Sequence, residues 1–391
     1  MINRSVLIFI TTLACLFATS AFCSPTASDE RPKIGLVLGG GGAHGVAHLG
    51  VLKELERQRV PVDFVVGTGF GGIIGGLYAS GMTTAEIEAF LFDNDWASIF
   101  NPDAQRQDLS FRRKRDDDDF LIKYSVGVRD GQAQLPTSLI PNQRFSQLLQ
   151  STTAHAKFTQ DFDKLPVPFR AVAMDLLTGE EVVLDSGSLD RAMLATFSSP
   201  GTFSPVQIDG KTLISGSLVN HLPVDVAREW GADILIVIDV GIYIRDEEDL
   251  NSIFAIANQV DHLLQDRNSR ASLNTLTEDD IVIQPELTPF QTANVSDPAL
   301  NVRAAAAAVS SAAAQFAHLR LDETAYSRFD EERVARASQL PVISEIELLN
   351  DSDVSDAVIL AQISQPLNEQ LNKDALDADV RSVLGSGAGS A

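Results

Sequence analysis

Lys33–Gly45 read KIGLVLGGGGAHG, and Val65–Gly72 read VVGTGFGG. The first stretch is a compact apolar run that ends in a glycine loop, as expected for a strand leading into a helix. Val46–Gln58 follows with leucines at helical spacing, and Val62–Val66 is another apolar run of strand length. Strand, glycine loop, helix and strand in this order predict a parallel sheet with helices on both faces.

The rest of the chain continues this alternation. Thr83 followed by Glu86 forms the pattern of a capping box, which predicts a helix running through Phe92. Gly71–Ala79 has the composition of a buried helix, and Val224–Trp230 is also helical in pattern. Apolar runs predict further strands at Phe169–Met174, Val182–Leu184, Thr212–Ile214 and Ile234–Val240. We therefore expect an α/β fold with a mostly parallel central sheet.

The glycine loop has two chemical interpretations. Gly40, Gly42 and Gly45 have the spacing of a dinucleotide-binding loop. That function needs an acidic residue at the end of the second strand, but here Asp63 lies at its beginning. The alternative is an oxyanion hole, in which backbone N–H groups point at developing negative charge and absent side chains admit the substrate. We favour the oxyanion hole.

The second strand runs into Gly67-Thr68-Gly69-Phe70-Gly71, directly before the buried helix. A strand, a sharp turn and a helix are the geometry of a nucleophile elbow, whose central residue is strained and is a serine in hydrolases. Here the central residue is Gly69. Glycine relieves the backbone strain but supplies no oxygen to attack an ester.

These stretches, together with MLATFSSPGTFSPV (Met193–Val206) and LISGSLVNHLPVDVA (Leu213–Ala227), resemble the patatin-like phospholipases over residues 33–320. The resemblance implies a three-layer α/β/α fold and a Ser–Asp dyad that hydrolyses lipid acyl esters without histidine. Its nucleophile position maps to Gly69 and its base position to Ser215, in Ser215-Gly216-Ser217. The implied oxyanion hole is formed by Gly40, Gly41, Gly42, Ala43 and His44, and the elbow by Gly67, Phe70 and Gly71.

Both dyad positions are therefore substituted. A serine hydroxyl cannot accept a proton near neutral pH as a carboxylate can. We expect a catalytically inactive, lipid-binding pseudohydrolase. The alternative is an active acyl hydrolase with an unmapped nucleophile, for which Thr68, Ser198 and Ser199 are candidates by motif order. Thr68 should point away from the site, Ser199 precedes a structural turn, and neither has an assigned base.

Other polar residues favour structural roles. His44, His48 and His221 could form a zinc site, but structural roles explain them better: His44 is a loop residue, His48 packs on the helix, and position 221 tolerates Asn or His in the family that the chain resembles. Asp175 and Asp209 fit turn and cap roles. We expect neither a metal nor a cofactor.

Residues 1–23 have the pattern of a signal peptide, with Arg4 before the apolar run Val6–Leu16. We expect a linker at 24–32 and another at 321–339, with an alanine-rich helix (Ala304–Ala308 and Ala312–Ala314) before the second. Residues 340–391 resemble the first part of a POTRA domain, with a strand in Val342–Leu349, two helices, no barrel and a flexible tail. We expect export to the periplasm or beyond.

The chain of 391 residues carries a net charge of −23. This charge argues against nucleic acid and against tight docking on anionic lipid. The charge run Arg112–Arg115 and Asp116–Asp119 is best explained as a solvated turn. The expected partner is a phospholipid or fatty acyl ligand, with peripheral membrane contact at most, and the sequence leaves the oligomeric state open.

Overall fold

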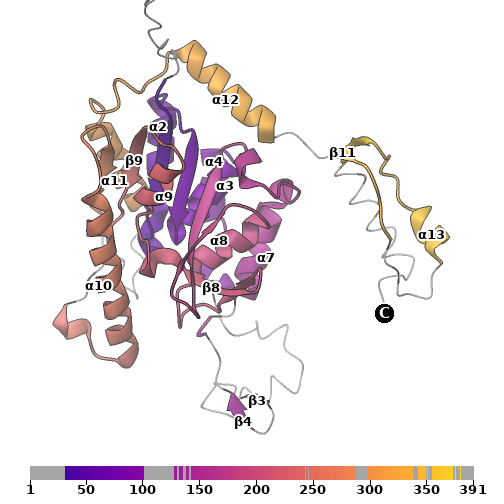
Figure 1. Cartoon of the computed structure of the whole chain (residues 1–391), viewed down its shortest axis with the longest axis horizontal. Coiled ribbons are helices and arrows are strands. Elements are labelled where there is room, and N and C mark those ends of the chain that lie inside the picture. The colour runs from indigo at the N-terminus through magenta and orange to yellow at the C-terminus, as the bar shows by residue number, and fades with distance from the viewer. Residues whose placement is uncertain are drawn as a thin grey trace, which may run out of the picture.

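An eight-stranded sheet forms the centre of the protein in the computed structural model (Figure 1). The strand order is β10-β9-β1-β2-β5-β8-β7, and β6 pairs with β5 beside this path. Neighbours from β10 to β5 run parallel, whereas β6 and β8 are antiparallel to β5, and β7 to β8. The strands are β1 Ile34–Leu38, β2 Phe64–Thr68, β5 Phe169–Asp175, β6 Glu181–Leu184, β7 Val206–Ile208, β8 Lys211–Ser215, β9 Ile234–Ile238 and β10 Ile281–Ile283. The mostly parallel central sheet is confirmed.

The structure describes residues 31–100, 127–129, 132–134, 138–140, 142–287 except 243 and 245, 298–337, 342–348, 350, 355–372, 375 and 379. The expected signal peptide, most of the first linker and the charge run 112–119 lie outside these residues. The helices longer than one turn that contribute to the domain are α2 Ala47–Arg57, α3 Phe70–Ala79, α4 Thr84–Phe92, α7 Gln143–Thr152, α8 Leu189–Phe197, α9 Val224–Glu229, α10 Ile253–Leu273, α11 Pro298–Ser311 and α12 Glu323–Ala337.

Alternate residues of the parallel strands point into two different cores. In β1, Leu36 and Leu38 join the larger apolar cluster, which includes residues of α2, α3, α8 and α11. Val37, between them, joins a smaller cluster with α9 on the opposite face. Because both faces are buried, the strands are apolar along their whole length instead of alternating with polar residues. The result is the three-layer α/β/α arrangement that the sequence predicted.

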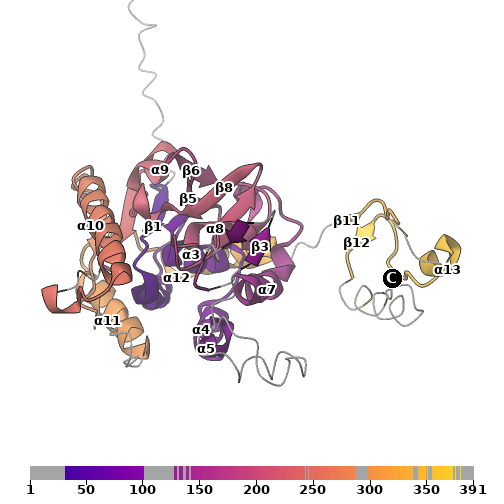
Figure 2. The same cartoon turned by 90° about the horizontal axis from the view of Figure 1, so that it is seen from below.

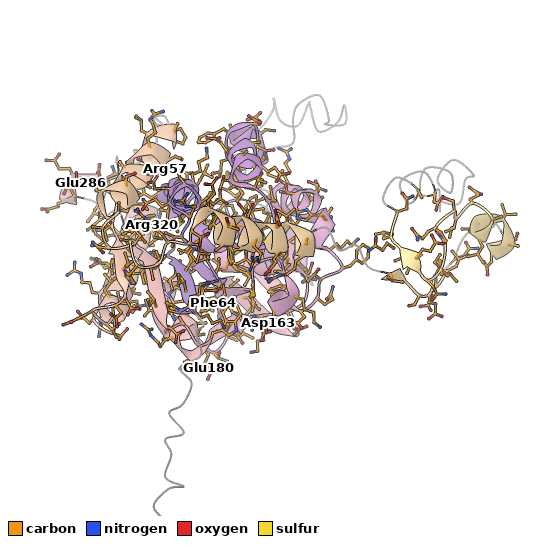
Figure 3. The ribbon with its side chains drawn as sticks, turned by 90° about the horizontal axis from the view of Figure 1, so that it is seen from above. Arg57, Phe64, Asp163, Glu180, Glu286 and Arg320 are labelled. Atoms are coloured by element: carbon orange, nitrogen blue, oxygen red, sulfur yellow. The ribbon has the colours of Figure 1, made fainter. Side chains whose placement is uncertain are left out.

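The α9 face is closed by aromatic and charged side chains. The rings of Phe64 and Trp230 lie 4.4 Å apart, and the guanidinium of Arg170 lies 4.0 Å from the Trp230 ring. Arg170 also forms an ion pair with Asp163 at 2.7 Å. Figure 3 labels the two ends of this chain of contacts, with the fully buried Phe64 inside the domain. Stacking and charge together cover the edge of the smaller core.

Most predicted elements are confirmed, and the structure differs from the predictions in several places. Thr83 and Glu86 form the expected capping box at the start of α4. Helices α7, α8 and α10 and the short strands β7 and β10 were not predicted. The alanine-rich helix α11 ends at Ser311, so Ala312–Ala314 lie beyond it. Part of the expected second linker is helix α12, whose Arg333 is buried beside Glu56.

The C-terminal segment is separate from the domain in Figures 1 and 2. The strand expected across Val342–Leu349 is confined to β11, Val342–Ile343, which pairs antiparallel with β12, Glu369–Gln370. One short helix, α13, spans Asp356–Leu360. The second expected helix lies mostly outside the described residues, and the POTRA resemblance stays a prediction. Among the described helices, none is both long and apolar enough to cross a membrane.

Candidate active-site cleft

The turn between β2 and α3 has the backbone of a strained elbow. Gly69 has φ 59° and ψ −127°, a conformation that residues with a side chain adopt only at a cost. Its N–H donates to the Thr196 hydroxyl at 2.9 Å, and its carbonyl accepts from the amides of Gly72 and Ile73. Strand β2 and helix α3 therefore hold position 69 at the tip of the turn, as the sequence predicted.

The glycine loop lies directly beside this elbow. Gly41 and Gly42 have positive φ, at 97° and 55°. The Gly40 N–H donates to the His221 carbonyl at 3.3 Å, so it is already occupied. In contrast, no described residue accepts a backbone hydrogen bond from the amides of Gly41, Gly42 or Ala43. These N–H groups are available to an anionic or carbonyl oxygen, as an oxyanion hole requires. Its assignment stays a prediction.

The two dyad positions face each other. A Cβ atom built on Gly69 would lie 4.0 Å from the Ser215 hydroxyl oxygen. Ser215 ends β8, and its hydroxyl donates to that of Ser217 at 3.2 Å. The Ser217 oxygen would lie only 3.1 Å from the same Cβ. The fold thus brings the mapped nucleophile and base positions together, with Ser217 crowding the space between them.

A cavity of 270 Å³ opens at this point. Apolar side chains and short polar groups share its wall, and helix α10 closes one side. A second cavity of 130 Å³ shares several of these residues and adds Asn258 and Asp261 of α10. The larger cavity is lined by Gly40, Gly41, Gly42, Ala43, His44, Gly69, Phe70, Phe197, Ser199, Ser215, Ser217, Ile242, His262 and Gln265. The contribution of His262 and Gln265 was not predicted, since α10 itself carried no recognisable motif.

The remaining hydroxyl candidates from the sequence either have structural roles or lie at the rim of the cavities. Thr68 is buried, and its hydroxyl donates to the Asn220 carbonyl at 3.0 Å, away from the cavity. Ser198 donates to the Leu194 carbonyl at 2.8 Å. Ser199 is exposed and lines both cavities, which makes it more accessible than its position before a turn suggested.

The two acidic candidates occupy turns, as expected. Asp175 accepts from the Leu177 amide at 3.0 Å in an Asx turn. Asp209 adopts φ 49° in the hairpin between β7 and β8. Neither lines a cavity.

Two buried histidines lie beneath the glycine loop. The His48 ring contacts the Gly39 carbonyl at 2.9 Å through Nε2. His221 is fully buried, and neither ring nitrogen has a hydrogen-bond partner. Burial lowers the pKa of each imidazole to about 4, because desolvation penalises the charged form. No group of three or more metal-binding side chains occurs within the described parts of the chain.

These histidines should make folding sensitive to mild acid. In the unfolded chain both imidazoles take up protons near pH 6.5, whereas the folded state keeps them neutral down to a pKa of about 4. Stability is therefore complete above pH 6.5 and falls as the pH drops toward 4. At pH 5 each histidine should cost about 2 kcal/mol relative to pH 8. Urea unfolding at several pH values measures this.

His48→Gln is the matched control, because it keeps a donor for the Gly39 carbonyl and removes one titration. We expect this variant to lose roughly half of the pH dependence. Equal unfolding free energies at pH 7.5 and pH 5 in the native chain would contradict the burial of neutral imidazoles.

Comparison with known families agrees with the geometry of the cleft. Residues 36–228, which include the glycine loop, the elbow and Ser215, match the model of the family described as patatin-like phospholipase. The chain contains a patatin-like phospholipase domain. The fold of this patatin-like domain is the one expected from the sequence resemblance, whereas the roles of its glycine loop and elbow stay predictions.

Relatives of the patatin-like domain occur in animals and bacteria. Patatin-like phospholipase domain-containing protein 6 of Mus musculus is 33% identical over 226 residues, 56% of this chain and 14% of its own length. An uncharacterised NTE family protein of Mycobacterium bovis is 27% identical over 212 residues, 54% of this chain and 50% of its own. The chain thus spans about one seventh of the length of the mouse relative and half the length of the mycobacterial one.

Among solved structures, VipD from Legionella pneumophila is similar, with a TM-score of 0.41 and 13% sequence identity. The similarity covers 92% of this chain and 81% of the VipD chain.

Proposed function

We propose that this protein is a catalytically inactive patatin-like domain that binds a lipid acyl group. One observation carries the proposal. The positions that face each other across the elbow, 69 and 215, hold a glycine and a serine, so the cleft has no nucleophile at the turn and no carboxylate beside it. Local geometry supports the proposal, because the backbone at Gly69 still has the conformation of an elbow between β2 and α3.

Acyl transfer needs an attacking oxygen and a group that accepts its proton. The side-chain oxygens nearest a Cβ on Gly69 are the hydroxyls of Ser217 and Ser215, at 3.1 and 4.0 Å. Each is itself a weak acid that holds its proton near neutral pH. A hydroxyl beside another hydroxyl therefore has no base, and losing the nucleophile alone costs roughly a millionfold in turnover in a serine hydrolase.

The cavity supports lipid binding. Phe70, Phe197 and Ile242 give it apolar walls, and the Gly41 and Gly42 amides offer two donors at one end. Ligand sites commonly combine apolar walls with a few polar groups in this way. An acyl chain would contact the apolar side chains while its ester carbonyl accepts from the amides.

Ser199→Trp tests this binding, because Ser199 is exposed at the rim and shared by both cavities. An indole there should fill the opening and weaken binding of a fluorescent fatty acid at least about tenfold. Leu177→Trp is the control, since Leu177 is 79% exposed in the turn after β5 and lines neither cavity. Equal binding by both variants, or no binding by the native chain, would refute a ligand site here.

The second candidate is an active hydrolase with an unmapped nucleophile. One observation favours it: Ser199, Ser217 and His262 all line the smaller cavity, together with Asp261. If His262 were the base, His262→Gln should lower turnover of a short-chain nitrophenyl ester by about 100-fold or more. An unchanged background rate in that variant would favour the inactive domain.

We also propose that the protein is exported, on the pattern of residues 1–23. Cell fractionation tests this proposal. A chain that is found in the cytoplasm and still carries its first 23 residues would contradict it.

A further inference from the structure

The inner face of helix α10 is polar, whereas its outer face is aliphatic. Ile253, in the first turn of the helix, is 85% exposed. The polar side chains that are partly buried and line the two cavities recur at helical spacing: Asn258, Asp261, His262 and Gln265. A surface helix normally turns its apolar side toward the core. Departures from such local rules are expected at functional sites.

Contacts beyond the cavities hold the helix in this orientation. The Asn268 side-chain amide donates to the Leu218 carbonyl at 2.7 Å, and the neighbouring Ser269 is buried. Figures 1 and 2 both show α10 along one edge of the domain. The polar face of α10 is therefore a fixed wall of the cleft.

Several polar side chains of the smaller cavity have no hydrogen-bond partner among the residues that the structure describes. These side chains are Thr202, Asn258, Asp261 and Gln265. The hydroxyl and the two amides can both donate and accept, whereas an ionised carboxylate only accepts. A ligand with several hydroxyl groups matches this set, because each hydroxyl can donate to Asp261 or accept from an amide.

The charge of this wall disfavours an anionic head group. Among the described residues that line either cavity, Asp261 is the one Asp or Glu, and none is Lys or Arg. Burial raises the pKa of Asp261, because desolvation penalises the carboxylate, and the nearby His262 counteracts this effect. A phosphate group, which proteins commonly hold with Arg or Lys, would meet this carboxylate without either. A hydroxyl group brings no such repulsion and donates to the carboxylate.

The two cavities meet, and their junction fixes the direction of an ester. Their shared lining is Ser199, Ser215, Ser217, His262 and Gln265. The glycine loop and the apolar side chains of Phe70, Phe197 and Ile242 line only the larger cavity. An ester whose carbonyl lies at the glycine loop and whose acyl chain lies on these apolar side chains has its alcohol part at the junction. The alcohol part therefore enters the smaller cavity.

We propose that the smaller cavity is a subsite for an uncharged polyol head group, so that the cleft binds an acylglycerol in preference to an anionic phospholipid or a free fatty acid. This inference rests on the proposed lipid binding and adds the chemistry of the ligand's alcohol part. The smaller cavity has a volume of 130 Å³ against 270 Å³ for its neighbour, which suits a compact head group such as glycerol.

Displacement of a fluorescent fatty acid from the full-length purified protein at pH 7.5 tests the subsite. 1-Monooleoylglycerol should displace the probe at a concentration at least about tenfold lower than oleate or oleoyl lysophosphatidic acid, because hydrogen bonds to the head group add to the same acyl contacts. Asp261→Asn and Asn258→Leu should each weaken 1-monooleoylglycerol at least about tenfold. Neither change should weaken oleate, which has no head group to lose.

Asp266→Asn is the matched control for Asp261→Asn. It makes the same change of charge on the same helix, at a residue that lines neither cavity. This variant should bind 1-monooleoylglycerol and oleate like the native chain. Unfolding curves of all three variants show whether each of them is folded.

Three results would overturn the subsite while leaving lipid binding in place. The first is equal displacement by 1-monooleoylglycerol and oleate in the native chain. The second is a folded Asp261→Asn variant whose affinity for 1-monooleoylglycerol is unchanged. The third is tighter binding of lysophosphatidic acid or lysophosphatidylcholine than of 1-monooleoylglycerol. If neither the fluorescent fatty acid nor 1-monooleoylglycerol binds the native chain, the proposed function and the subsite are both wrong.

Discussion

Gly69→Ser, Ser215→Asp and Ser217→Ala, combined in one chain, should produce an esterase. The first two changes supply the nucleophile and the base at positions whose geometry already brings them together. The third removes the hydroxyl that would lie 3.1 Å from the new Cβ and crowd the serine. Since a complete nucleophile and base are worth about a millionfold, we expect turnover of a nitrophenyl ester to rise at least about 1,000-fold.

The order of activities is as informative as the increase. The triple variant should exceed the double variant Gly69→Ser, Ser215→Asp, and each single variant should stay near the native background. Serine at φ 59° also stores strain of about 1 to 3 kcal/mol, so Gly69→Ser should lower the melting temperature. A folded triple variant without turnover would show that the cleft lacks more than its dyad, or that the mapped positions are wrong.

Gly71→Ala should destabilise the protein more than any other substitution proposed for it. A Cβ at this position would lie 2.3 Å from the Leu38 carbonyl oxygen and 2.4 Å from that of Gly39. Both atoms belong to the backbone at the end of β1, which is fixed on either side by strands β2 and β9. Because nothing flexible can give way, we expect a loss of about 3 kcal/mol in the free energy of unfolding.

Gly179→Ala is the matched control for this prediction. Gly179 has φ 74° in the turn after β5, and no atom lies within 4 Å of the place where its Cβ would be. Only backbone strain remains, at about 1 kcal/mol. Urea unfolding of both variants measures the difference. Equal losses would mean that the elbow does not pack against β1 as closely as the structure has it.

The sequence predicted the centre of this fold well because that centre is governed by local rules. An apolar run such as Lys33–Leu38 is stable as a strand in a sheet whose two faces are both covered. Glycines mark the places where backbones approach closely. The same stretches carry the elbow and the glycine loop, so position 69 was placed correctly. The pairing of position 69 with Ser215 came from the family resemblance, since β8 lies far from β2 along the chain.

The features that were missed depend on tertiary contacts. Helix α10 mixes apolar and polar residues with its apolar side outward, so a rule that places apolar residues in the core does not describe it. Its cavity residues His262 and Gln265 could not be found without knowing where the helix packs. Crowding by Ser217 likewise appears only when Gly69 and the end of β8 are seen together.

Intact mass measurement after incubation with a fluorophosphonate tests the central claim most directly. The claim is that no oxygen in this cleft has both the exposure and the base needed to attack. We predict no change in mass for the native chain and one added label for the triple variant, carried only by the serine introduced at position 69. A label on the native chain, mapped by peptide analysis to Ser199, Ser215 or Ser217, would contradict the account.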